Sequence, residues 1–147
     1  MIKLITVGKM NQKYLNEGIK YYQKQIPYKF EIIEVKDGKD EQAIKNEGEA
    51  ILKQIHDSDF VIALAIKGQM FSSEEFSQKI EDTMSYHTND IVFVIGGSYG
   101  LSNEVYERCQ LLISFSKMTF PHQMMRLIFI EQLYRAFMIM KNHPYHK

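Results

Sequence analysis

The sequence predicts an α/β protein built around a parallel sheet. Short β-branched or continuously apolar runs alternate with longer stretches whose apolar residues recur at helical spacing. Two of the short runs, 60–66 and 91–95, are almost entirely apolar, as strands are when helices cover both faces of a sheet. Strands that alternate with helices imply parallel connections. The length of 147 residues suits one domain, so we expect a single domain over residues 1–147.

The first half of the chain contains three expected strands separated by two helices. A β-branched run at 2–7 predicts the first strand, and apolar residues at helical spacing predict a helix over 11–25. A second strand is expected at 30–35 and a second helix at 40–56. The apolar run at 60–66 predicts a third strand, and we expect this strand to be central in the sheet.

The second half of the chain begins with a helix start signal. Ser72 is followed by Glu75 three residues later, the pattern of a capping box, which predicts a helix that continues to about His87. Pro121 is suited to a first helical turn and predicts the start of the final helix. The remaining elements are a strand at 91–95, a short helix at 102–109, a strand at 111–114 and a final helix from 121 to 140.

Composition excludes several classes of protein. The single cysteine, Cys109, cannot form an internal disulfide, and there is neither zinc-ligand spacing nor a charged-then-apolar leader, so we expect a cytoplasmic protein without a metal. The most apolar segment, 124–140, contains Arg126, Glu131 and Arg135 and is too short and too charged to span a membrane.

Charge is distributed unevenly along the chain. The formal net charge is zero, which by itself argues against a nucleic-acid partner. However, residues 1–30 carry six lysines against one glutamate, a balance of +5, whereas residues 31–90 are acidic and the balance is positive again after residue 91. The basic N-terminal part is either a solvated lysine face of an amphipathic helix or a face that binds RNA.

Three segments carry candidate functional residues. Ligands of parallel sheets bind beyond the carboxyl ends of the strands, where we find the glycine-rich turn 96–100 and the loop 114–123. The turn matches neither a dinucleotide fingerprint nor a phosphate-binding loop, so a plain strand-to-helix turn is an open alternative. The C-terminal tail, 143–147, gathers two imidazoles, a phenol and an ammonium, and is either functional or a frayed terminus.

The sequence resembles the large-subunit ribosomal RNA methyltransferase H family, the pseudouridine N3-methyltransferases of the SPOUT superfamily. The matching segments follow one another in order over nearly the whole chain. They are Val7-Gly8-Lys9, Val94-Ile95-Gly96-Gly97-Ser98-Tyr99-Gly100, Ser114-Phe115-Ser116-Lys117-Met118-Thr119-Phe120-Pro121-His122-Gln123, Glu131-Gln132-Leu133-Tyr134-Arg135-Ala136 and His143-Pro144-Tyr145-His146-Lys147. Two departures from the family are a short 36–48 segment and Gln25 in place of a frequent arginine.

The resemblance implies a fold, a cofactor and a reaction. The fold would be a mainly parallel sheet of five or six strands with a C-terminal trefoil knot. The activity would be S-adenosylmethionine-dependent methylation of N3 of a pseudouridine in 23S ribosomal RNA, with the ribosome as partner. The positions that match the donor-binding segments are Leu64, Gly96, Gly97, Phe115, Ser116, Lys117, Met118, Thr119 and Phe120. Backbone groups could make much of the adenine recognition, with glycines allowing close approach of the ligand.

The tail would supply the catalytic groups. N3 of a pseudouridine carries a proton at neutral pH, and a histidine suits its removal, so His146 is the candidate base with Tyr145 and Lys147 orienting the ring. Positioning with proton loss to water is the rival mechanism. His122 and His143 are expected to be structural, and Cys109 is expected to be a buried helix residue and not a nucleophile.

The final helix also bears on assembly, because its apolar residues cover more than one face. Apolar residues on more than one face of the helix are explained either by complete burial within the monomer or by a homodimer interface. The family is dimeric with both subunits contributing to each site, so the resemblance implies a homodimer. Two other functions remain open: a ribosome-binding paralogue that does not methylate, and a small nucleotide-binding or receiver-type module.

Overall fold

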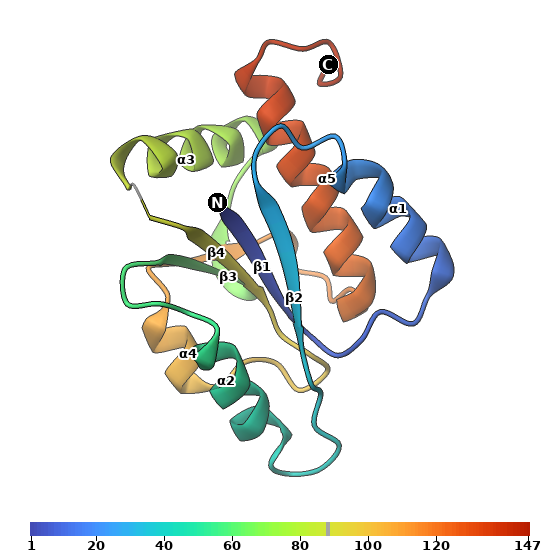
Figure 1. Cartoon of the computed structure of the whole chain (residues 1–147), viewed down its shortest axis with the longest axis vertical. Coiled ribbons are helices and arrows are strands. Elements are labelled where there is room, and N and C mark those ends of the chain that lie inside the picture. The colour runs from blue at the N-terminus through green and yellow to red at the C-terminus, as the bar shows by residue number, and fades with distance from the viewer. Residues whose placement is uncertain (88) are drawn as a thin grey trace.

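The computed structural model describes residues 1–87 and 89–147 and shows one five-stranded sheet flanked by helices (Figure 1). The strands are β1 (Ile2–Val7), β2 (Phe30–Val35), β3 (Phe60–Met70), β4 (Ile91–Ile95) and β5 (Leu111–Ser114). The helices are α1 (Lys13–Gln23), α2 (Ala43–Lys53), α3 (Ser73–Tyr86), α4 (Asn103–Arg108) and α5 (His122–Met140). The expected order of strands and helices is therefore confirmed.

Every pairing within the sheet is parallel, and the strand order is β2-β1-β4-β3-β5. The prediction that the third strand is central is wrong, because β4 lies at the centre and β3 lies between β4 and β5. Both strands have long apolar runs because both are interior and are covered on both faces. An apolar run marks an interior strand without saying which interior position it takes.

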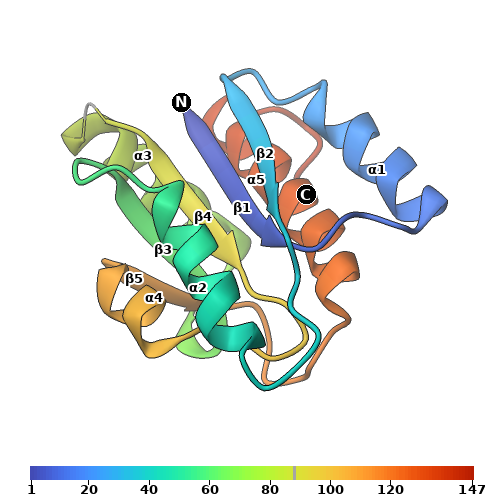
Figure 2. The same ribbon diagram turned by 60° about the horizontal axis from the view of Figure 1, so that its bottom comes forward.

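Side chains of each strand alternate between two apolar cores. On β4, Phe93 and Ile95 belong to one core, whereas Val92 and Val94 belong to the other. The first core is closed by α1, α3 and α5, and the second by α2 and α4. Figures 1 and 2 show these two helical layers on opposite faces of the sheet.

The third strand is longer than expected and irregular. It continues to Met70, and its register against β5 shifts between Leu64 and Gln69, which both pair with Ile113. Gly68 lies in this irregular part, where a β-carbon would come within 2.7 Å of the backbone N and C of Ile113. Only glycine permits this approach of the chain to β5.

The third helix starts as the sequence predicts. Ser72 is its N-cap, and the Ser72 hydroxyl and the Glu75 carboxylate each accept a hydrogen bond from the other residue's backbone N–H. The last helix begins one residue later than expected, with Pro121 as its N-cap. The second helix is shorter than 40–56 at both ends.

The final helix α5 lies between α1 and α3 on the first face of the sheet (Figure 1). Every residue of α5 is buried or half-buried within the single chain, including Arg126, which is 2% exposed. Of its half-buried apolar residues, Leu127 packs against Gly18 of α1, and Ile128 lines a cavity between α3 and α5. Within the described part of the chain, no helix is both long and apolar enough to cross a membrane.

Candidate active site

A cavity of about 590 Å³ lies at the carboxyl ends of β4 and β5, beside the middle of β3. Its walls come from five segments: residues 64–67 of β3, the turn 95–101, Tyr106 of α4, the loop 114–120, and the start of α5. This is the edge at which parallel α/β sheets bind their ligands. A volume in the range of about 300–1,000 Å³ suits a small molecule such as a nucleoside derivative.

The candidate donor-binding residues converge on this cavity. Eight of the nine line it: Leu64, Gly96, Gly97, Phe115, Ser116, Met118, Thr119 and Phe120. Lys117 does not line the cavity and is exposed. Met118 and Thr119 are also exposed, so the cavity is open to solvent along this part of the loop.

The glycine turn is held against the rest of the protein and does not simply leave space for a ligand. A β-carbon on Gly96 would lie 3.0 Å from the side chain of Leu101, and one on Gly97 would lie 2.9 Å from Val7. The two glycines therefore let the turn pack tightly on Leu101, which also lines the cavity, and on the end of β1. Gly100 has a φ of +82°, a conformation that favours glycine.

The loop after β5 is held by its own side chains. The Ser114 hydroxyl donates to the Ser116 carbonyl at 3.0 Å, and the Ser116 hydroxyl accepts from the Met118 backbone N–H at 3.0 Å. The ring of Phe115 packs edge-on against Phe76 and near-parallel to Phe129. These contacts preorganise an apolar wall beside the glycine turn.

Sequence reasoning missed several residues of the cavity wall. Lys67 lies over the ring of Tyr106, with its Nζ 3.8 Å from the ring centroid, and both line the cavity. His122, which was expected to be structural, also lines it. Burial and, next, the nearby Arg126 lower the pKa of His122, so this imidazole is neutral at pH 7. Its position at the start of α5, next to the loop, was the available signal.

The C-terminal tail is docked and does not fray. Tyr145 donates through its hydroxyl to Oε1 of Glu131 at 3.0 Å, and its ring contacts Tyr134 edge-on and lies under Arg135. Partial burial, with Tyr22 and Glu131 beside its hydroxyl, raises the pKa of Tyr145, so the phenol stays protonated. The tail therefore forms a defined cluster on α5.

His146 joins the tail to α3. Its Nε2 is 2.5 Å from Oε1 of Glu74, and its Nδ1 is 3.1 Å from Nη1 of Arg135. Because a guanidinium can only donate, Nδ1 accepts and Nε2 carries the proton that faces Glu74. The contact with His146 lowers the pKa of Glu74. Lys147, the third candidate catalytic residue, is exposed.

The larger cavity and the tail lie apart within one chain. The cavity adjoins the start of α5, and the tail follows the end of this helix, whose 19 residues span about 28 Å. None of residues 143–147 is among those lining the cavity. The doubling-back of the tail brings Tyr145 to Glu131, near the middle of α5 (Figure 1).

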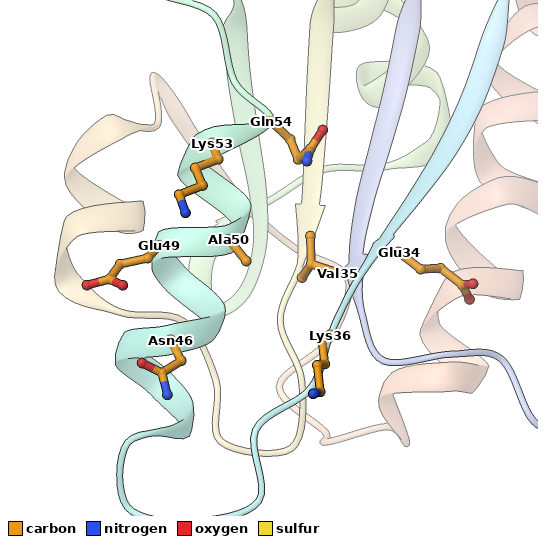
Figure 3. Close-up of a pocket in the computed structure, with 8 residues that line it drawn as sticks. All are labelled: Glu34, Val35, Lys36, Asn46, Glu49, Ala50, Lys53 and Gln54. Carbon is orange, nitrogen blue, oxygen red and sulfur yellow. The ribbon is translucent and has the colours of Figure 1, made fainter.

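A smaller cavity of about 230 Å³ lies between α3 and α5 and shares Phe115 and Phe120 with the larger cavity. Polar atoms on its wall come from Ser72, Ser73 and Gln132. We call this cavity the α3–α5 slot. Another depression, between α2 and the end of β2, is lined by polar and charged side chains such as Lys36, Glu49 and Lys53 (Figure 3). Two of its lining residues, Lys36 and Asn46, belong to the 36–48 segment.

Cys109 is not where the sequence analysis expected it. It is half-buried and caps the end of α4, so it is not a buried helix residue. Burial raises the pKa of its thiol to about 11, and the thiol is therefore protonated at neutral pH. Among residues 1–87 and 89–147, no three His, Cys, Asp or Glu side chains cluster in a way that could hold a metal ion.

The fold and the cavity define an α/β protein with a cavity of small-molecule size at the carboxyl edge of a parallel sheet. A family model described as predicted SPOUT methyltransferase matches residues 1–146. Curated proteins named ribosomal RNA large subunit methyltransferase H are 52% identical in Streptococcus gordonii, 50% in Streptococcus suis and 49% in Streptococcus mutans, each with 99% of both chains covered. The chain belongs to the SPOUT methyltransferases and, within them, to the ribosomal RNA large subunit methyltransferase H family.

A solved structure supports the fold. A probable methylase family protein from Haemophilus influenzae matches with a TM-score of 0.60 at 15% identity, over 99% of this chain and 70% of that one. The alignments with the streptococcal proteins extend over 157 residues, more than the 147 of this chain. These relatives therefore carry residues that this chain lacks.

Proposed function

We propose that this protein is a cytoplasmic S-adenosylmethionine-dependent methyltransferase that methylates N3 of a pseudouridine in 23S ribosomal RNA. The streptococcal relatives at about 50% identity carry a name that states ribosomal RNA large-subunit methylation. The observation that supports the proposal best is the convergence of residues 64–67, 95–101 and 114–120 on one cavity.

The cavity fits the proposed methyl donor. Phe115, Phe120 and Met125 offer apolar walls for an adenine ring, and Ser116 and Thr119 offer hydroxyl groups near them. The turn 96–100 brings backbone groups to the edge of the cavity. These residues would hold the adenosyl part, and the sulfonium of the donor supplies an electrophilic methyl group.

The reaction requires alignment and removal of one proton. The bond between sulfur and the methyl carbon breaks as the bond from N3 forms; the electron pair remains on sulfur, and the N3 proton leaves. His146 is the proposed base, with Tyr145 and Lys147 orienting the ring. In the described arrangement the Nδ1 lone pair of His146 faces Arg135, so His146 must give up this contact to accept the proton.

The exposed face of α1 supports an RNA partner. Lys13, Lys20 and Lys24 are exposed there, and Tyr14 and Tyr21 are 62% and 55% exposed. Basic side chains interleaved with exposed aromatic rings suit phosphate contacts and base stacking. We therefore favour the RNA-binding interpretation of the basic N-terminal segment over that of a merely solvated face.

A homodimer and a knot are part of the proposal. A second copy would cover the part of the apolar surface of α5 that stays half-buried within one chain, such as Met124, and sedimentation should report twice the monomer mass of 17.3 kDa. The close passage of Gly68 across Ile113 supports a chain that threads past itself after β3.

The activity is tested with ribosomes from a strain that lacks the gene. The purified protein and S-adenosylmethionine should add one methyl group to a single pseudouridine of 23S RNA, detected by mass spectrometry of nuclease fragments. Protein that binds ribosomes and S-adenosylmethionine but transfers no methyl group would contradict the proposal.

A further inference from the structure

The α3–α5 slot has the size and position to hold one nucleobase next to the donor cavity. Its volume, about 230 Å³, is below the range of about 300–1,000 Å³ that is usual for sites of larger ligands. Phe115 and Phe120 line both cavities, so a group in the slot would lie against a group in the donor cavity. Enzymes that act on a base move it out of the stack into such a pocket.

The slot combines aromatic walls with one polar pair. Phe71 and Phe76, together with the two shared phenylalanines, surround its occupant with rings on which a base can stack. The polar pair is Ser73 and Gln132, in which the Ser73 hydroxyl donates to Oε1 of Gln132 at 2.8 Å. This hydrogen bond joins α3 to α5 across the slot.

Gln132 retains unused hydrogen-bonding capacity. Its Oε1 accepts one hydrogen bond from Ser73, and its Nε2 donates one to Oε2 of Glu131 at 3.1 Å. A carboxamide has two lone pairs and two N–H groups, so one acceptor and one donor remain. Together they match a planar edge that offers an N–H next to a carbonyl.

A pseudouridine has such an edge away from the reacting nitrogen. Its ring is joined to the sugar through C5, so N1–H and C2=O are free, whereas in uridine N1 is bonded to the sugar. We propose that Gln132, oriented by Ser73, binds the N1–H and C2=O edge of the pseudouridine in the α3–α5 slot and thereby selects it over uridine. The inference rests on the proposed methyltransferase function. Gln132 is a specificity residue, and N3 is left free to face the donor.

The tail contacts agree with this arrangement. His146 and Tyr145 bind Glu74 and Glu131, which directly follow Ser73 and precede Gln132 in the chain. The side chain of Glu131, which accepts from Tyr145, also accepts from Gln132, so the tail is linked by hydrogen bonds to the polar pair of the slot.

The test compares two substrates in one assay. Ribosomes from a strain lacking this gene carry pseudouridine at the target, and ribosomes from a strain that also lacks the pseudouridine synthase carry uridine there. Gln132→Leu should lower kcat/KM on the pseudouridine ribosomes by about ten- to a hundredfold, as expected for loss of a bidentate pair, and leave the rate on uridine ribosomes unchanged. Ser73→Ala should act in the same direction with a smaller effect.

Structural damage gives a different result, because it lowers both rates equally. Gln78→Leu, on the exposed side of α3, is the matched control and should retain the wild-type rates. An equal loss on both substrates, no loss on either, or a weaker calorimetric affinity for S-adenosylmethionine in Gln132→Leu would overturn the inference. If Gln132→Leu does not fold, the comparison is made with Ser73→Ala. A larger loss of kcat/KM on pseudouridine ribosomes than on uridine ribosomes would then support the inference. Wild-type protein that methylates neither ribosome would instead refute the proposed function.

Discussion

Arg126 donates a hydrogen bond of 2.7 Å to Oε2 of Glu34, which joins the final helix to the end of β2. The same guanidinium donates to the carbonyls of Val7 and Gly8 at 2.7 Å each. Glu34 Oε2 also accepts the backbone N–H of Met10. The guanidinium therefore fixes the carboxyl ends of two strands beside the candidate site.

Replacing this guanidinium should destabilise the fold. We expect Arg126→Met to lower the free energy of unfolding by about 3–5 kcal/mol, because two buried carbonyls lose their donor. Glu34→Gln should lower it by no more than about 1.5 kcal/mol, since the amide oxygen still accepts. Urea denaturation measures both, with the exposed Lys45→Met as a control expected to stay within about 0.5 kcal/mol. Equal stability of Arg126→Met and wild type would show that the carbonyls find other donors.

The glycine turn predicts a graded effect on donor binding. Gly96→Val should weaken S-adenosylmethionine binding at least about tenfold, because its side chain would collide with Leu101 and move the cavity wall. Gly96→Ala should have a smaller effect, since the flexible end of Leu101 can yield. Calorimetry measures the affinities, and Lys117→Gln, on the same edge but off the cavity, should bind within about twofold of wild type. Normal affinity in Gly96→Val would exclude this cavity as the donor site.

The tail predicts a separation of binding from chemistry. Deleting Tyr145, His146 and Lys147 should leave donor affinity unchanged, because none of them lines the donor cavity, while methylation of ribosomes falls by orders of magnitude. His146→Ala alone should lower kcat by about 10²–10⁴ if it is the base. A loss of kcat smaller than about tenfold would favour the rival mechanism, in which the enzyme only positions the pseudouridine and the N3 proton is lost to water. Full activity after truncation would place the catalytic groups elsewhere.

The lysines of α1 predict a salt-dependent interaction. Replacing Lys13, Lys20 and Lys24 with glutamine should weaken ribosome binding and reduce the slope of log affinity against log salt by about 2–3, because fewer counterions are released. Donor binding and oligomeric mass should not change. Glutamine replacement of Lys39, Lys45 and Lys53, which lie away from α1, is the charge-matched control. If the α1 variant instead becomes monomeric, this face is a subunit contact and not an RNA contact.

The lowered pKa of His122 predicts that the folded protein loses stability as the pH falls. Its pKa in the folded protein is lowered from 6.5 by burial, so below pH 6.5 the unfolded chain binds a proton that the folded chain does not. The stability is fully present above pH 6.5 and declines as pH falls towards the lowered pKa. Denaturation at a series of pH values should show this decline in wild type, and it should be smaller in His122→Gln. An identical decline in both would assign it to other groups.

Much of the fold was accessible from local sequence patterns. The five strands, the capping box of Ser72 and Glu75 and the parallel connections follow from periodicity and end signals, which act over a few residues. The segments 96–100 and 114–123 were recognisable because glycine-rich and chemically varied loops at strand ends differ from ordinary connections. Local patterns could not give the strand order, and so they misplaced β3 at the centre.

The tertiary structure decided the features that depend on distant pairs of residues. The sequence marked residues 96–100 and 114–123 as candidate ligand-binding segments. Only the folded chain decided that Gly96 faces Leu101, that Lys117 does not line the cavity and that His122 does. It also brought Ser73 to Gln132, which lies 59 positions away. The physical reason is that helix and strand signals are local, whereas side-chain pairing across the core depends on how helices pack on the sheet.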